Sequence, residues 1–497
     1  MRCLVALLLT VPALAQPGTP SPPAGPTPLD SLRRGLAGLG NAVWLTGENA
    51  AGLRQWQSFG YGTTQLAGHQ TTGAFRRPQE PLRHTELALR SEGLRLVNGW
   101  AVFGAFAYRK TVDQRIAFSH GYDPFNGNPY LWADTLAGNW QRDHIRARVA
   151  VASPRFGRIR LGLSLPYHVG QGARLLDPKP FYRFRELGVL PSVWYDASPR
   201  WQWGLVLGGR FTQEENEVGF FVVQPDFPLL YRLRGYGSFS RTPIVTAERR
   251  ITGSVGQLTL QSVYRTGDGS WLAQVGGQWR RETILEGIAS PEPGGLFTET
   301  TADALLARVR QRGAGGNRLA LHTQARLGRG IDPILRATGA TYTLTTTHLS
   351  ATRWQQAPER FAQQTARLTA ETLAYSDQIT RTDWSAVRLT GYLDARHRWE
   401  RTNGRAWYAH AGLGLRYVPA RSLVALRPTT LTDQLVRPDY HIQTQNALLG
   451  SLAVGREFRF DRTGDLLHRL EARLDGQFTD QTGHRLTAGL TYSLVYR

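Results

Sequence analysis

The feature that most constrains this chain is a short segment, repeated many times, in which apolar and polar side chains alternate. Because successive side chains of a strand point to opposite faces, each segment has one apolar face and one largely polar face. A tilted strand of about ten residues is long enough to cross a bilayer. The last segment, 486–497, shows the pattern well, and its apolar face consists of Leu486, Ala488, Leu490, Tyr492, Leu494 and Tyr496.

Aromatic side chains stand at the ends of many of these apolar faces. The clearest segments are 158–167, 200–211, 271–280 and 405–417, and each has Trp, Tyr or Phe at or near an end. Half-buried strands of soluble sandwiches also alternate, but they have no reason to place aromatics at strand ends. A membrane barrel needs an apolar band with aromatic girdles at both interfaces. The pattern therefore favours a membrane β-barrel.

Short and long connections alternate in the clearest stretches, as expected for short periplasmic turns and long external loops. Every backbone polar group in lipid must be paired, so the sheet should close with an even number of strands. The count predicts an all-β membrane protein, a closed antiparallel transmembrane β-barrel of roughly 18–20 strands. The strand count is uncertain by two because the number of strands in residues 213–248 is ambiguous from the sequence. The predicted long connections are 110–138, 170–187, 284–296 and 419–439.

The N-terminal region divides into three parts before the barrel. A positive start, an apolar run and a small-residue cleavage site predict a secretory signal peptide over 1–15. Residues 16–28 form a Pro-rich tether. Residues 29–55 carry a helix-like apolar stretch and are predicted to form a plug, since a barrel of ~18 strands leaves an open lumen unless something fills it. The barrel is predicted over 56–497. The single cysteine, Cys3, leaves with the signal, so no disulfide is expected.

The charge balance is strongly basic and almost wholly due to arginine. The net charge is +21, and Lys110 and Lys179 are the only lysines among 59 basic residues. A nucleic-acid partner is not expected for an exported chain. Arginine binds carboxylates and phosphates in bidentate fashion, so a lumen or rim that meets acidic solutes or lipopolysaccharide phosphates is one explanation. A GC-rich genome, which favours arginine codons, is the other.

Eight arginines fall on faces that the alternation assigns to the lumen. A pore lined by arginine favours anions. The alternatives are an ion-pair network with acidic residues in the lumen, or arginines that extend toward the interface at strand ends. The candidate lumen-lining residues are Arg146, Arg148, Arg160, Arg210, Arg280, Arg308, Arg310 and Arg416.

Residues 487–494 resemble the terminal signal by which outer-membrane barrels are recognised for assembly, which reads polar, x, Gly, x, x, aromatic, x, apolar. The chain departs from that pattern by ending in Arg497. The resemblance implies the barrel-assembly machinery as a partner. We expect the terminal strand to close the barrel against a strand near 58–67. The implied signal residues are Gly489, Tyr492, Leu494 and Tyr496.

The sequence shows no chemistry-bearing motif. The histidines are scattered without a metal-ligand spacing, so no metal, cofactor or enzymatic activity is predicted. Two pairs, His120 with Asp123 and His144 with Asp143, could be read as a hydrolase site at the outer rim. We interpret them as polar residues of a loop and of the lumen.

Four stretches occur in an order and spacing similar to a known family. They are 44–53 (WLTGENAAGL), 75–80 (FRRPQE), 129–138 (PYLWADTLAG) and 177–180 (DPKP). They resemble an uncharacterised outer-membrane β-barrel family of Bacteroidetes-type bacteria, known only as a domain of unknown function. The resemblance implies an outer-membrane barrel and supplies no activity.

We therefore expect a monomeric barrel in the outer membrane, surrounded by lipid and lipopolysaccharide, that passes or gates a small solute. An anionic solute is favoured if the arginines line the pore. A structural barrel that anchors or assembles surface or secretion complexes is the alternative from another class. A barrel enzyme that acts on lipid ranks below both.

Overall fold

The computed structural model describes residues 48–53, 60–219, 229–244, 246–287, 290–357, 359–400, 405–459, 466–481 and 483–496. Residues Asn41–Arg497 form one compact unit. The predicted signal peptide, the tether and most of the predicted plug lie outside the described residues.

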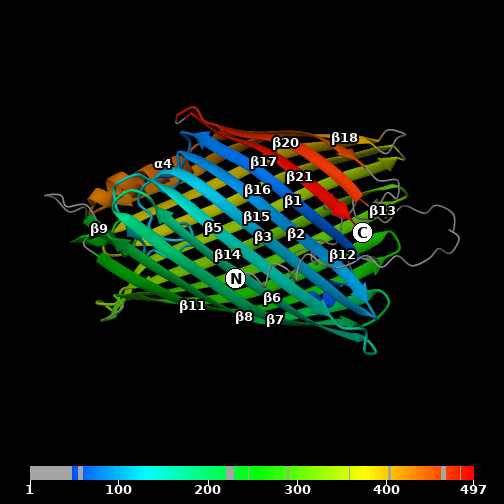
Figure 1. The fold of residues 1–497 in the computed structure, drawn as a ribbon, viewed down its shortest axis with the longest axis horizontal. Coiled ribbons are helices and arrows are strands. Elements are labelled where there is room, and N and C mark those ends of the chain that lie inside the picture. The colour runs from blue at the N-terminus through cyan, green and yellow to red at the C-terminus, as the bar shows by residue number, and fades with distance from the viewer. Residues whose placement is uncertain are drawn as a thin grey trace. The chain divides into compact units, whose positions relative to one another are not determined.

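The described residues form a closed antiparallel barrel of eighteen strands, which confirms the predicted fold class (Figure 1). Each strand pairs with the next along the chain, and the last pairs with the first. The barrel strands are β1 (Tyr61–Gly73), β2 (Arg83–Val97), β3 (Trp100–Ile116), β5 (Gly138–Ala152), β6 (Ile159–Arg174), β7 (Lys179–Asp196), β8 (Trp201–Gly219), β11 (Thr246–Thr266), β12 (Gly269–Glu286), β13 (Glu292–Arg312), β14 (Gly315–Ile331), β15 (Thr338–Ala357), β16 (Arg360–Asp377), β17 (Thr382–Glu400), β18 (Ala406–Ala425), β19 (Ala447–Phe458), β20 (Leu466–Phe478) and β21 (His484–Tyr496).

The terminal strand closes the barrel as the sequence predicted. β21 pairs with β1, which overlaps the expected partner near 58–67, and Tyr496 lies opposite Gly62 in the register. The predicted faces of β21 are also confirmed, because Leu490 is 55% exposed on the outside and Ser493 is 6% exposed. Each of the eighteen described wall strands is paired on both sides, as a lipid environment requires.

The two ends of the barrel differ. At one end, here called the turn end, tight connections such as 98–99 and 313–314 join neighbouring strands. At the other, the loop end, long insertions follow β3, β8 and β18, and Figure 1 shows β9 and α4 there at the left. The ambiguous stretch 213–248 contains the end of β8, the start of β11 and, between them, the insertion that carries β9 and β10.

Two of the predicted long connections are wrong. Most of 170–187 belongs to β6 and β7, and most of 284–296 belongs to β12 and β13, so the actual connections are short. The strands extend farther toward the loop end than their apolar faces do. Polar residues in these extensions pair in the sheet like any others, so polarity alone did not separate loop from strand.

Large apolar side chains point outward along the wall. Tryptophans gather on the outer face at the turn end, each between 41% and 48% exposed: Trp100, Trp201, Trp271, Trp399 and Trp407. An outer apolar band with interfacial tryptophans is the surface that a bilayer matches.

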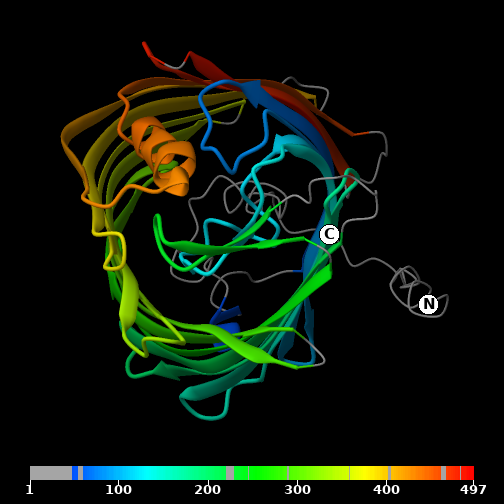
Figure 2. The ribbon, with the colours of Figure 1, turned by 90° about the vertical axis from the view of Figure 1, so that its left-hand side faces the viewer.

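Further elements lie inside the ring of strands, as Figure 2 shows. A three-stranded sheet is built from β4 (Trp132–Ala133), β9 (Leu229–Leu233) and β10 (Phe239–Pro243). The insertion after β18 contains η3 (Thr432–Val436) and α4 (Arg437–Gln443), and the N-terminal part contributes η2 (Ala50–Gly52). Among the described residues, no helix is both long and apolar enough to span a membrane.

Candidate functional site

Three insertions meet inside the loop end and share a small apolar core. The β4 strand pairs with β9, with Ala133 opposite Tyr231. Leu431 and Leu435, from the insertion that carries η3, pack against these residues. Since these contacts join segments from three connections, the insertions form one interlocked body.

The β3–β5 insertion, residues 117–137, is held by a buried ion pair between its Asp134 and Arg174 at the end of β6. Asp134 accepts from Arg174 at Nη2 (2.5 Å) and Nη1 (3.1 Å), and His120 Nε2 lies 2.7 Å from its Oδ2. Burial lowers the pKa of His120 and outweighs the charge and hydrogen bond of Asp134, which raise it; the charges of Arg174 and Arg249 add a smaller lowering. Burial raises the pKa of Asp134, but hydrogen bonds and charge from His120 and Arg174 outweigh it and hold the pKa at about 2.

The same insertion is fixed to the barrel wall by polar contacts. The buried Arg249 of β11 donates to the backbone carbonyl of Tyr130 (2.9 Å). The Tyr122 amide donates to Glu214 of β8 (3.0 Å), and the Asn128 side chain donates to Glu282 of β12 (2.8 Å). Hydrogen bonds to charged groups contribute about 1.5–3 kcal/mol each.

A cavity of about 230 Å³ lies between this insertion and the wall. Tyr122 and Asn126 of the insertion line one side. Arg280 is the basic residue of the lining; its Nε donates to Glu282 (2.8 Å) and its Nη1 to the Asn126 carbonyl (3.1 Å). The acidic lining residues, all from the wall, are Glu186, Glu214, Glu282 and Glu299.

The N-terminal segment docks against the inner face of the wall, on strands that include β7, β11 and β13. Ala51 is fully buried in an apolar cluster that includes Trp194 and Ala307. Its amide donates to Ser192 (3.1 Å), and the Asn49 side chain donates to Gln261 (2.8 Å). The described residues 48–53 therefore line the lumen, while the remainder of the predicted plug lies outside the described residues.

Six of the eight candidate arginines lie on the inner face. Three approach carboxylates: Arg210 reaches Glu48 (2.5 Å), Arg160 lies 3.6 Å from Asp196, and Arg280 pairs with Glu282. The structure thus brings several arginines into ion pairs spread around the wall.

The other three inward arginines have surroundings of different kinds. Arg146 donates to the Tyr122 hydroxyl (3.3 Å), and Arg148 donates to the Ser164 hydroxyl (2.9 Å). Arg416 lies between the outward residues Leu415 and Tyr417, so alternation turns it inward.

The lumen position predicted for Arg308 and Arg310 is wrong. Arg308 lies opposite Trp271 in the register, on the outer face, and its guanidinium stacks 5.1 Å from that indole. Both arginines pair with Asp268 at the turn end. The parity was misjudged because the inner face of β13 is itself apolar here: Ala307 and its inward neighbours pack against the cluster around Ala51.

The two histidine–aspartate pairs considered from the sequence do not form. Asp123 accepts from the Phe125 amide (2.8 Å), while His120 pairs with Asp134 instead. Asp143 accepts from the Tyr108 hydroxyl (2.6 Å) on the face opposite to His144.

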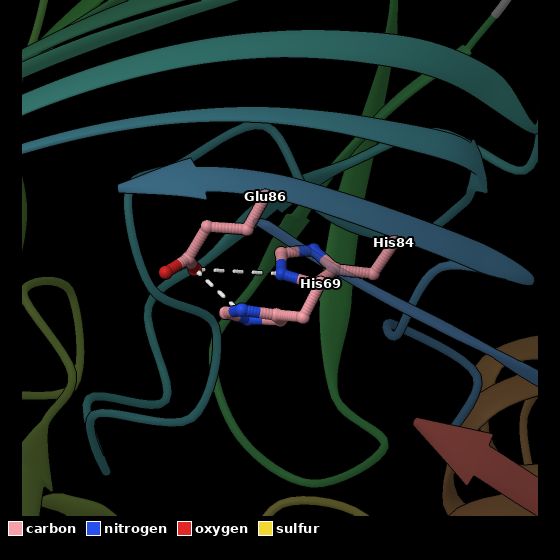
Figure 3. Close-up of side chains that lie close together, drawn as sticks. All are labelled: His69, His84 and Glu86. Atoms are coloured by element: carbon pink, nitrogen blue, oxygen red, sulfur yellow. Dashed lines mark ion pairs between the residues drawn. The ribbon is translucent and has the colours of Figure 1, made fainter. Parts of the chain in front are cut away.

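One group that sequence reasoning missed is His69, His84 and Glu86, whose potential ligand atoms all lie within 4.8 Å of one another (Figure 3). The available signal was His84 and Glu86 two apart on one strand, but only the register supplies His69.

The closed wall, apolar outer face and occupied lumen define a membrane β-barrel. Residues 50–496 match the model described as "Family of unknown function (DUF6850)", and the chain belongs to this family. The match confirms the predicted membership of a family of unknown function and does not test the attribution to Bacteroidetes-type bacteria; its description assigns no activity.

The fold is similar to outer-membrane barrels of known structure. A bacterial polysaccharide outer membrane secretin aligns with a TM-score of 0.35 and 11% identity over 88% of this chain and 98% of that chain. BauA, the ferric preacinetobactin receptor from Acinetobacter baumannii, aligns with a TM-score of 0.40 and 8% identity over 88% of this chain and 80% of that chain. A Pseudomonas aeruginosa FadL homologue aligns with a TM-score of 0.31 and 10% identity over 90% of this chain and 92% of that chain. No curated protein matches the chain.

Proposed function

We propose that the protein is an outer-membrane barrel that passes a small polar solute through a gated lumen. The observation that carries this proposal is the charged cavity of about 230 Å³ between the β3–β5 insertion and the wall. One side of the cavity belongs to the insertion and the other to the barrel. Displacement of the insertion would therefore open the cavity toward the loop end.

The contacts support an insertion body that moves as a unit. The insertions adhere to one another partly through an apolar core that includes Ala133, Tyr231 and Leu435. Residues 117–137 meet the wall in part through hydrogen bonds to charged side chains such as Glu282. Water can replace these hydrogen bonds when the insertions move, whereas the apolar packing of Tyr130 against Ile251 and Phe297 of the wall opposes the displacement.

Inner-face charge supports a polar solute. The wall presents arginines such as Arg146 and Arg148 and, at the cavity, glutamates such as Glu186. Anion preference is part of the proposal, because Arg146 and Arg148 donate to hydroxyl groups in these hydrogen bonds and not to carboxylates.

The apolar outer face and the predicted signal peptide support residence in the outer membrane. We propose export through cleavage after residue 15, insertion by the barrel-assembly machinery, contact with lipid and lipopolysaccharide, and a monomeric state. Trp201 and Trp271 on the outer face are placed as interfacial anchors would be.

A structural or anchoring barrel is the second candidate, because interlocked insertions and η2 occupy the lumen. Such a barrel would not conduct, and it would co-purify with partner proteins. Conductance therefore separates the two functions.

The test is planar-bilayer recording of the purified full chain, together with Asn128→Ala. The variant removes the hydrogen bond to Glu282 and should raise the open probability. Asn317→Ala, at the exposed turn end of β14, is the matched control and should behave as wild type. A folded protein that never conducts, as wild type or as Asn128→Ala, would overturn the channel and favour the structural barrel.

A further inference from the structure

His69, His84 and Glu86 converge on the inner face near the loop end (Figure 3). The Nε2 atoms of His69 and His84 lie 3.7 and 3.6 Å from Glu86 Oε2. Ligand atoms about 2 Å from one tetrahedrally coordinated ion are separated by roughly 3.3 Å. The three side chains therefore need only small rotamer adjustments to share one cation.

The strand register creates this group. His69 of β1 lies directly opposite Glu86 of β2. His84 is two residues from Glu86, so both side chains point to the same face. Gly489 lies opposite His69 on the other side, and a β-carbon there would come within 3.2 Å of the His69 β-carbon. Glycine thus leaves room beside the imidazole.

A carboxylate orients one of the imidazoles. Asp113 of β3 lies opposite His84, and its Oδ1 is 2.5 Å from His84 Nδ1. Arg142 holds the other oxygen of Asp113 at 2.7 Å. A carboxylate on the far nitrogen of a metal-binding histidine sets its tautomer and leaves Nε2 as the ligand. This contact is independent of the three-residue cluster and points to the same chemistry.

We propose that His69, His84 and Glu86 bind one divalent transition-metal ion of the Zn²⁺ class. Two imidazoles and one carboxylate suit Zn²⁺, Co²⁺, Ni²⁺ or Cu²⁺, whereas Mg²⁺ and Ca²⁺ prefer oxygen ligands. Three protein ligands leave a fourth position for water or a solute from the lumen. The binding requires no passage of solute, so the proposal is independent of the channel.

Access and charge are compatible with reversible binding. The side chains of His69 and His84 are 32% and 24% exposed, while Glu86 is buried at 6%. Arg109 lies 3.7 Å from Glu86 and balances its charge. The Arg109 side chain is 39% exposed, so it can swing into the lumen when a cation takes its place.

The experiment uses the full chain, free of any histidine tag, purified in detergent and treated with a chelator. Zn²⁺ is titrated against a chromophoric competitor, and Co²⁺ absorption reports the ligand set. We expect one saturable site above background, with Mg²⁺ unable to compete. His69→Ala and Glu86→Gln should remove that site. Asp113→Asn should weaken it by about 10–100-fold, the usual effect of removing an orienting carboxylate.

The matched control is His322→Ala, an inward histidine of β14 that stacks on His348 outside the cluster. It should bind Zn²⁺ as wild type does. Heat-dependent gel mobility checks that each variant is folded. The proposal fails if wild type shows no Zn²⁺ binding above that of His69→Ala. It also fails if wild-type Co²⁺ gives only the octahedral spectrum of the aqueous ion, a result that needs no variant.

Discussion

Gly162 lies so close to the N-terminal segment that a β-carbon at this position would be 2.1 Å from the backbone nitrogen of Ala51. Such a separation is far below any van der Waals contact. The wall at β6 therefore accepts the η2 backbone only because residue 162 has no side chain. This contact couples a strand of the barrel to the segment that occupies its lumen.

Gly162→Leu should displace residues 48–53 from the wall without unfolding the barrel. The added side chain would clash with Ala51, so Ala51 should no longer pack in the apolar cluster around Trp194. We expect faster proteolysis of the N-terminal segment and, in the proposed channel, larger conductance. Gly391→Leu is the control, because its β-carbon would meet nothing within 4 Å. Equal proteolysis of the two variants would contradict the coupling.

Acidification should release the β3–β5 insertion in two stages. The pKa of His120 is lowered in the docked state, so its contribution is present above about pH 6.5, the ordinary value, and is lost as pH falls below it. The pKa of Asp134 is also lowered, to about 2, so its contribution of about 2 kcal/mol is lost between roughly pH 4 and pH 2.

Hydrogen exchange of residues 117–137 measures this release as a function of pH. Protection of these amides should first decline below about pH 6.5, where His120 takes up a proton. The variant His120→Gln should lack this first decline and keep the second, which comes from Asp134. Protection of the paired strand β14 serves as the internal reference. Constant protection of the insertion from pH 7 to pH 5 would rule out the assigned role of His120.

Tyr492→Ala should reduce insertion into the outer membrane severalfold while leaving the conductance of inserted molecules unchanged. Tyr492 points outward from the closing strand and is 37% exposed, so it lines no part of the lumen. Tyr417→Ala on β18 removes another outward aromatic outside the resembled signal. The measurement is the heat-modifiable fraction in membranes at equal expression. Equal losses in both variants would indicate a general interfacial effect instead.

Neutralising Arg146 and Arg148 together as glutamines should shift the reversal potential toward lower anion preference. Both donate to hydroxyl groups on the inner face, so their charges act on the lumen. The comparison variant is Arg308→Gln, because Arg308 lies on the outer face and should leave selectivity unchanged. A cation preference in the wild type would disprove anion selectivity.

Local alternation was sufficient to predict the wall. In β21 the sequence alone assigned Leu490 to the outside, and this holds because strand geometry is a property of neighbouring residues. The same reasoning failed at Arg308, where Ala307 and its inward neighbours face an apolar partner inside the lumen. Alternation shows which face of a strand is apolar. At β13 the apolar face is the inner one, because it packs against the N-terminal segment inside the lumen.

The sequence by itself determined a closed barrel, its approximate strand number and the closing pair, because these follow from local periodicity and from the length of the spanning segments. The family came from the resemblance of four short motifs. Only the tertiary structure decided what the lumen contains. The contacts of Ala51 with Ser192, Arg249 with Tyr130 and His69 with Glu86 join residues on different elements. Such contacts depend on register and on the folding of insertions inward, and no short-range pattern encodes either.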